Sequence, residues 1–253
     1  MSVTAADVKA LRDKTGCGMM ACQKALKETN GNTEEAMELL RKKGEAKAGE
    51  KSERAAGEGV IAVSGRTALV LNCETDFVAR NEDFQAYAQE LADVAASDGA
   101  DAAKALFEEK KGEKVAAIGE NLVLGAIQTI EGGDTVGSYV HSNKKVAALV
   151  ALEGGSEEAA RDVAMHATAM DPLVANPEDV PADSIEKEKA IYREQLINEG
   201  KPEQIIDKII EGKVNKFCAE RALSSQAFVK DPSQTVAQYL GDGKLVGFVR
   251  LAV

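Results

Sequence analysis

Large aromatic rings are scarce in this sequence of 253 residues, which has six Phe, four Tyr and no Trp. One ring stands outside any apolar run. The apolar stretch 67–73 ends in Glu74-Thr75-Asp76, and Phe77 follows before a helix start at Asn81. A ring beside two acids on a connection indicates either a contact with another molecule or a hydrophobic staple that folds back on the following helix.

Cysteine and histidine are too few and too dispersed to form a zinc site. The four cysteines share no Cys-x-x-Cys spacing: Cys17, Cys22, Cys73 and Cys218. With only two histidines, no set of zinc ligands can be assembled. We therefore expect four reduced thiols in an intracellular protein that has no metal site and no cofactor.

Signals for membranes and export are missing as well. No apolar run approaches the roughly 20 residues that cross a bilayer. The N-terminal stretch MSVTAADVKALRDK lacks the charged-then-apolar pattern of a signal peptide. We expect a soluble, cytoplasmic protein that does not bind membranes.

Motifs for covalent catalysis are also absent from the sequence. None of the Gly-Lys pairs at 200, 212 and 243 is followed by the Ser or Thr of a phosphate loop, and no Gly-x-Ser-x-Gly elbow occurs. His141, at the end of an expected strand, and His166, inside an expected helix, are typical of surface or core imidazoles. The sequence therefore predicts a protein that is not an enzyme.

Acidic side chains outnumber basic ones by 42 to 31, which gives a net charge of −11. A negative surface repels phosphate backbones, so we expect a protein partner and no direct contact with nucleic acid. Residues 1–57 contain 11 basic and nine acidic side chains and carry +2, which leaves −13 for the remainder. The N-terminal part is thus electrostatically distinct.

Capping residues and apolar spacing predict three short helices in the N-terminal part. Thr4 begins the first helix, Gly16 ends it, and Asn32 or Thr33 begins the third. The polar segment 44–59 has no apolar period and is predicted to be a linker that is helical in part.

A diverged duplication follows. Residues 59–74 and 137–153 share one layout, a Gly, a short β-run, a polar turn and a second apolar run, and each precedes an amphipathic helix. The apolar faces of these helices are Phe84, Ala88, Leu91 and Ala95 in the first, and Ala159, Val163, His166 and Met170 in the second. The pattern predicts an α+β core of two related halves.

Residues 183–218 favour an antiparallel pair of helices, because Gly200 suits a helix C-terminus and Pro202 the start of the next helix. The apolar stripes of the two arms are Ile185, Tyr192 and Leu196, and Ile206, Ile210, Val214 and Phe217. Such an arm is typical of an interaction element, and packing on the core is the alternative.

Five stretches in chain order resemble the bacterial elongation factor Ts family: residues 11–44, LNCETDFVARNEDF at 71–84, AMHATAMDPL at 164–173, EGKPEQIIDKIIEGKVNKF at 199–217 and SSQAFVKDPSQTV at 224–236. The most specific pieces are the Thr-Gly-x-Gly-Met-Met turn and the Thr-Asp-Phe-Val stretch. The resemblance covers essentially the whole chain.

The resemblance implies an architecture of an N-terminal three-helix module, like a ubiquitin-associated domain, two related core subdomains and a coiled-coil hairpin that protrudes. The implied ranges are 1–54 for the module and linker, 55–136 for the first subdomain, 137–182 with 219–253 for the second, and 183–218 for the hairpin. It also implies a guanine nucleotide exchange factor. Such a factor binds elongation factor Tu, with GDP or nucleotide-free, and promotes GDP release for exchange with GTP in translation elongation.

By the same resemblance, the residues that enter the partner and disturb its magnesium site are Thr75, Asp76, Phe77 and Val78. The other implied partner contacts are Arg12, Met19, Met20, Lys24, Ile118 and His141. The sequence departs from the family pattern at Ala21, Gln23 and Ala227, where an acid, a base and a proline are usual. Because polar contacts are missing at Ala21 and Gln23, and no catalytic motif occurs, a module that binds the partner without releasing nucleotide is the alternative function.

Overall fold

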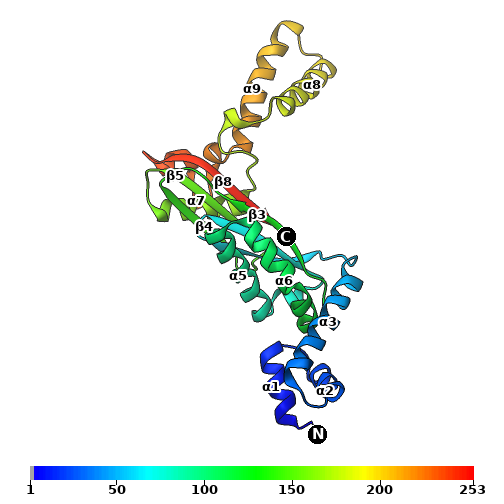
Figure 1. Ribbon diagram of the computed structural model, residues 1–253. Helices are drawn as coiled ribbons and strands as arrows, with labels where there is room; N and C mark the ends of the chain where they lie inside the picture. The colour runs from blue at the N-terminus through cyan, green and yellow to red at the C-terminus, as the bar shows by residue number, and fades with distance from the viewer. Residues whose placement is uncertain (1–2) are drawn as a thin grey trace. The chain divides into compact units, whose positions relative to one another are not determined.

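The computed structural model describes residues 3–253 and confirms an α+β fold of helices and small antiparallel sheets (Figure 1). Residues 1 and 2 of the predicted N-terminal module lie outside the described residues. The chain forms two compact units. The first comprises the described part of 1–129 with 143–146 and 251–253, and the second comprises 130–142 and 147–250. The finer division into four parts stays a prediction.

Three helices open the first unit: α1 (Ala5–Thr15), α2 (Met19–Glu28) and α3 (Thr33–Lys51). Thr4 caps α1, because its hydroxyl accepts the N–H of Asp7 while the Asp7 carboxylate accepts the N–H of Thr4. Gly16 ends α1 in the left-handed region, at φ 66°. Asn32, rather than Thr33, caps α3. The predicted starts and stops are thereby confirmed.

Helix α3 continues through residues 44–51, so these residues are the helical part of the predicted linker 44–59. Gly44 permits a close contact with α6 (Ala100–Ile118), since a Cβ at Gly44 would lie 2.3 Å from the carbonyl oxygen of Gly112. One turn further, Ala48 is buried in the core of the unit. The contacting face contains Gly44, Glu45 and Ala48 and no large apolar side chain, which explains why the sequence has no apolar stripe there.

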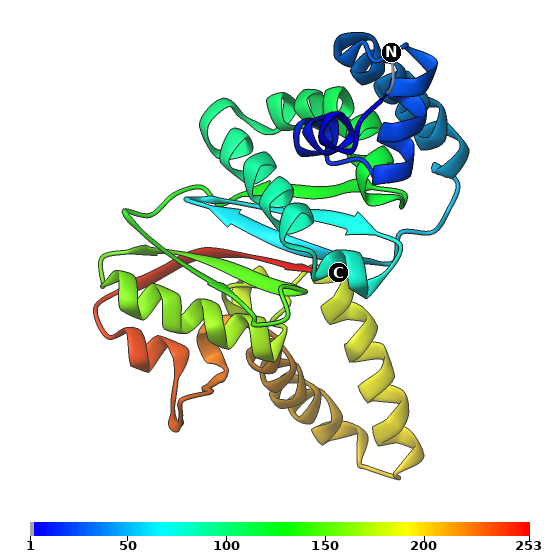
Figure 2. The ribbon, with the colours of Figure 1, turned by 90° about the horizontal axis from the view of Figure 1, so that it is seen from below.

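The sheet of the first unit has the order β1-β2-β3. Its strands are β1 (Glu58–Ser64), β2 (Thr67–Cys73) and β3 (Val123–Thr129). Helix α5 (Glu82–Asp98) packs across β1 and β2 and beside α6 (Figure 2). The predicted apolar face of α5 is buried against this sheet. The core that they form includes Phe84, Ala88, Leu91 and Ala95 from the helix and Leu69 and Leu71 from β2.

The sheet of the second unit has the order β4-β5-β8. Its strands are β4 (Thr135–Val140), β5 (Val146–Glu153) and β8 (Lys244–Ala252). Helix α7 (Glu157–Met170) packs on β4 at Gly137, where a Cβ would lie 2.2 Å from the backbone nitrogen of Arg161. The prediction that Met170 belongs to the apolar, buried face of α7 is wrong, because this residue is 47% exposed. The close contact at Gly137 turns the side of α7 that carries Ala160 and Ala164 toward the sheet instead.

Two antiparallel helices, α8 (Ala182–Asn198) and α9 (Glu203–Arg221), lie side by side in the second unit. Gly200 has φ 70°, and the N–H of Lys201 donates to the carbonyl of Leu196, which ends α8 as predicted. The side chains buried between them include Leu196, Ile206, Ile210, Val214 and Phe217. The remaining elements of the unit are the 3₁₀ turns η1 (Pro177–Asp179) and η2 (Leu223–Ser225), β6 (Ala227–Phe228), β7 (Asp231–Thr235) and α10 (Val236–Leu240).

Within residues 3–253, no helix combines the length and the apolar composition that crossing a bilayer requires.

Candidate functional site

A single helical turn, α4 (Asp76–Ala79), follows β2 and displays Phe77. Thr75 caps this turn, since its hydroxyl accepts the N–H of Val78 at 3.4 Å. Ala79 is buried and Val78 packs in part on the core, whereas the Phe77 side chain is 82% exposed. A ring that exposed does not pack on α5, so the staple alternative is wrong.

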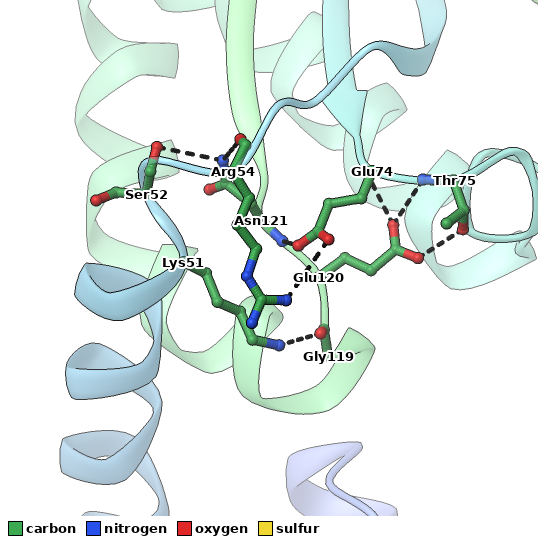
Figure 3. A network of polar contacts seen from close by, with 8 residues as sticks. All are labelled: Lys51, Ser52, Arg54, Glu74, Thr75, Gly119, Glu120 and Asn121. Carbon is green, nitrogen blue, oxygen red and sulfur yellow. Dashed lines mark hydrogen bonds and ion pairs between the residues drawn. The ribbon is translucent and has the colours of Figure 1, made fainter.

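Two carboxylates, those of Glu120 and Glu74, connect the residues before α4 with the loop after α6, because each accepts a backbone N–H of the other segment (Figure 3). The Oε2 atom of Glu120 accepts the N–H groups of Glu74 and Thr75, at 2.9 and 3.0 Å. Its Oε1 atom accepts the hydroxyl of Thr75 at 2.5 Å. In return, Oε1 of Glu74 accepts the N–H of Asn121 at 2.7 Å. Carboxylate acceptors make such hydrogen bonds about twice as strong as neutral ones.

The loop that carries Glu120 is itself bound to the end of α3. Asn121 is buried and its Nδ2 atom donates to the carbonyl of Arg54 at 2.8 Å, while Lys51 donates to the carbonyl of Gly119. The Nη1 atom of Arg54 lies 3.6 Å from Oε2 of Glu74. Figure 3 shows these groups as one network between α3 and α4.

The thiol of Cys73 adds a contact below the turn by donating to the carbonyl of Thr75 at 3.2 Å. Burial, together with the negative charge of Glu120, raises the pKa of Cys73 to about 12. The thiol therefore remains protonated and stays a donor at neutral pH.

The predicted residues of the N-terminal part lie on two helices. Arg12 is exposed on α1, and Met19 and Met20 begin α2 with 43% and 78% of their surfaces exposed. Met20 and Lys24 line a hollow of about 540 Å³, whose other basic members are Lys27 and Lys43. The structure thus gathers apolar and cationic groups here, in an arrangement that suits an acidic surface with apolar side chains.

Ile118, the last residue of α6, is half-buried and packs on the same core as Val78. Both line a hollow of about 610 Å³ in the first unit. His141 is exposed and belongs to the second unit, where its Nδ1 atom lies 3.5 Å from the Tyr139 hydroxyl. The structure therefore brings Ile118 and α4 together, whereas His141 is described with the other unit.

In the part of the chain that the structure describes, no group of three or more His, Cys, Asp or Glu side chains is placed to hold a metal ion. The reasoning from sequence did not identify Glu120, which is 45 residues from Thr75. No local pattern signals this pair, because only the fold brings residues so far apart in sequence into contact.

Comparison with known proteins gives one consistent result. The family model described as "Elongation factor TS" matches residues 74–253. The chain is 47% identical to "Elongation factor Ts" of Marinobacter nauticus, with 100% of this chain and 91% of the relative covered. The identity is 44% to that of Hydrogenovibrio crunogenus, with 100% and 92% covered. It is 45% to that of Nautilia profundicola, with 100% and 93% covered. The chain belongs to the elongation factor Ts family.

Proposed function

We propose that this chain is a guanine nucleotide exchange factor that binds elongation factor Tu with GDP, accelerates GDP release and stays bound to the nucleotide-free form until GTP enters. Membership of the family supports the role in translation elongation. The exposed ring of Phe77, on a turn whose neighbours are held by hydrogen bonds, is the observation that carries the proposed mechanism.

In this mechanism Phe77 is a wedge. Magnesium bridges the phosphates of a bound nucleotide and offsets their charge, so moving the partner segment that holds it weakens nucleotide binding. Burying a Phe side chain contributes roughly 1.5–3 kcal/mol, which is about a 10- to 100-fold change in an equilibrium constant. Asp76 adds a carboxylate next to the ring, and Thr75 and Val78 fix the turn. No covalent step is involved.

The remaining free energy that couples binding of this protein to GDP release has to come from a wider contact surface with the partner. We assign Arg12, Met19, Met20 and Lys24 to an N-terminal UBA-like module that anchors the partner. Ile118 and His141 add contacts from the two core subdomains. We further assign α8 and α9 to a coiled-coil protrusion, in keeping with the small apolar seam between them. The four ranges given above are the proposed boundaries of these parts.

Release of a fluorescent GDP analogue from elongation factor Tu of the same organism tests the proposal. The expected result is a release rate that rises with the concentration of this protein and then saturates. If calorimetry shows binding while the release rate stays unchanged at saturation, the protein is a binding module and the exchange function is wrong. Nucleic acid is not expected to be required in either assay.

A further inference from the structure

We propose that Glu120 is a positioning residue that holds α4 in the conformation presenting Phe77. This role rests on the exchange function proposed above. Glu120 does not need to touch the partner, because its two carboxylate oxygens are directed at Glu74 and Thr75 of its own chain (Figure 3).

The first argument is that α4 is too short to hold itself. One helical turn fixes several backbone dihedrals for a single hydrogen bond and is unfavourable alone. Within α4 the bonds are few, and the ring of Phe77 contributes little packing because it is 82% exposed. The turn therefore depends on groups outside it.

The second argument is that Glu120 supplies most of the polar contacts on the N-terminal side. It accepts the backbone N–H groups of Glu74 and Thr75 and the hydroxyl of Thr75. The Thr75 hydroxyl that donates to Glu120 is the same group that accepts the N–H of Val78. Glu120 thus orients the capping group and, through it, the residues that flank Phe77.

The third argument is that the residues on either side of Glu120 are themselves held by hydrogen bonds. Its neighbours Gly119 and Asn121 are bonded to the end of α3 through Lys51 and the carbonyl of Arg54. The N–H of Asn121 donates to Glu74, so residues 74–75 and residues 120–121 are hydrogen-bonded to each other in both directions. A group anchored in this way can restrict the movement of α4 before a partner arrives.

Restricting α4 in advance matters for a wedge, because a segment that must become ordered on binding loses affinity. Replacing Glu120 by Ala should lower stimulated GDP release by on the order of tenfold, the effect expected when hydrogen bonds to a charged group are lost. Glu120→Gln should keep most of the activity, since its oxygen can accept the two N–H groups and its amide can donate to the Thr75 oxygen. Glu120→Asp keeps the charge but is one methylene shorter, so it should resemble Glu120→Ala.

The control is Asp93→Ala. Asp93 accepts hydrogen bonds from Gln89 on α5, at 3.0 Å, and from Ser64, and these two bonds hold the pKa of its carboxyl below the usual value. Ser64 pairs with Thr67 at the end of the β1–β2 hairpin opposite Cys73, away from α4. Asp93→Ala therefore removes a hydrogen-bonded carboxylate from the same unit and should leave GDP release within about twofold of the wild type.

The deciding measurement combines Glu120→Ala with Phe77→Ala. If Glu120 acts through the ring, its replacement should change GDP release by less than about twofold once the ring is gone. A loss of the same factor in both backgrounds, or full activity of folded Glu120→Ala, would overturn the positioning role. If Glu120→Ala does not fold, Glu120→Asp replaces it in this comparison of single and double variants.

Hydrogen exchange separates this proposal from the exchange function. Should Phe77→Ala alone keep full activity, the wedge is wrong, and the amide exchange rates of Val78 and Ala79 decide the role of Glu120. Faster exchange of these amides in Glu120→Ala, but not in Asp93→Ala, supports positioning. Unchanged exchange rates overturn it.

Discussion

The carboxylate of Asp76 and the guanidinium of Arg80 form an ion pair across the single turn of α4, with Oδ2 and Nη2 3.1 Å apart. Their side chains are 43% and 81% exposed. Exposed pairs of this kind contribute about 0–1 kcal/mol to stability. Asp76 can therefore leave Arg80 for a partner at small cost in free energy.

Arg80→Ala should change the free energy of unfolding by less than about 1 kcal/mol. It should leave stimulated GDP release unchanged or higher, because the carboxylate of Asp76 no longer has to leave an ion pair. Arg80→Lys, which keeps the charge, is the matched control and should behave as the wild type. Thermal denaturation and release of a fluorescent GDP analogue give the two readouts. A loss of activity in Arg80→Ala would contradict this expectation and would show that Asp76 and Arg80 act together.

Phe77→Ala should separate stability from activity. The ring is 82% exposed, so the free energy of unfolding should change by less than about 0.5 kcal/mol. Stimulated GDP release should fall by roughly 10- to 100-fold, the equivalent of burying one Phe side chain. By linkage, the affinity for nucleotide-free elongation factor Tu should fall as well.

Phe77→Leu is the control, because it keeps an apolar side chain of smaller size and should lose less activity than Phe77→Ala. The double variant of Phe77→Ala and Asp76→Ala should be less than additive, since the residues are adjacent on one turn. A core-sized loss of stability, about 3–5 kcal/mol, in a protein that keeps full exchange activity would contradict the wedge.

Local signals in the sequence were sufficient for much of the fold. Helix caps act within four residues, so Thr4 and Asn81 could be predicted directly and Asn32 as one of two candidates, and the structure confirms all three as caps. The same holds for Gly200, whose positive φ ends α8. The placement of Phe77 outside the apolar face of α5 could also be predicted, because that face has a regular period.

Contacts between distant residues could not be predicted in this way. Neither the hydrogen bonds of Glu120 to Thr75 nor the close approach of Gly44 to Gly112 leaves a local pattern. Strand β3 was not predicted either, because most of its residues are exposed and it shows no alternating burial. Met170 was assigned to the buried face of α7 on period alone, whereas the position of Gly137 decides which side of that helix is covered.

Gly44→Ala should destabilise the protein by about 1–3 kcal/mol, because the added Cβ would lie 2.3 Å from a backbone oxygen of α6 and the helices would have to move apart. Gly49→Ala is the matched control in the same helix. Nothing lies within 4 Å of a Cβ at that position, so the change should stabilise by about 0.4–1 kcal/mol. Chemical denaturation measures both. Equal and small effects would show that α3 does not pack on α6 at Gly44.

The imidazole of His166 links α7 to the β6–β7 region and should make stability depend on pH. It is fully buried, its Nδ1 atom accepts the N–H of Val229 at 3.0 Å, and its Nε2 atom lies 3.0 Å from Oε1 of Gln226. The neutral ring therefore carries its proton on Nε2, and a second proton on Nδ1 would break the bond to Val229. Burial lowers the pKa of His166, and the contact with Gln226 opposes this only in part.

Because this pKa is lower in the folded than in the unfolded protein, the unfolded state binds more protons as the pH falls below about 6.5. The contribution of His166 to stability is thus complete above that pH and is lost as the pH falls through the folded-state pKa. His166→Asn cannot titrate but can still accept the N–H of Val229. It should be less stable at pH 7.5 by about 1–3 kcal/mol and should lose less stability than the wild type between pH 7.5 and 5.5. Parallel pH profiles of the unfolding free energy for the wild type and His166→Asn would show that His166 does not titrate in this range.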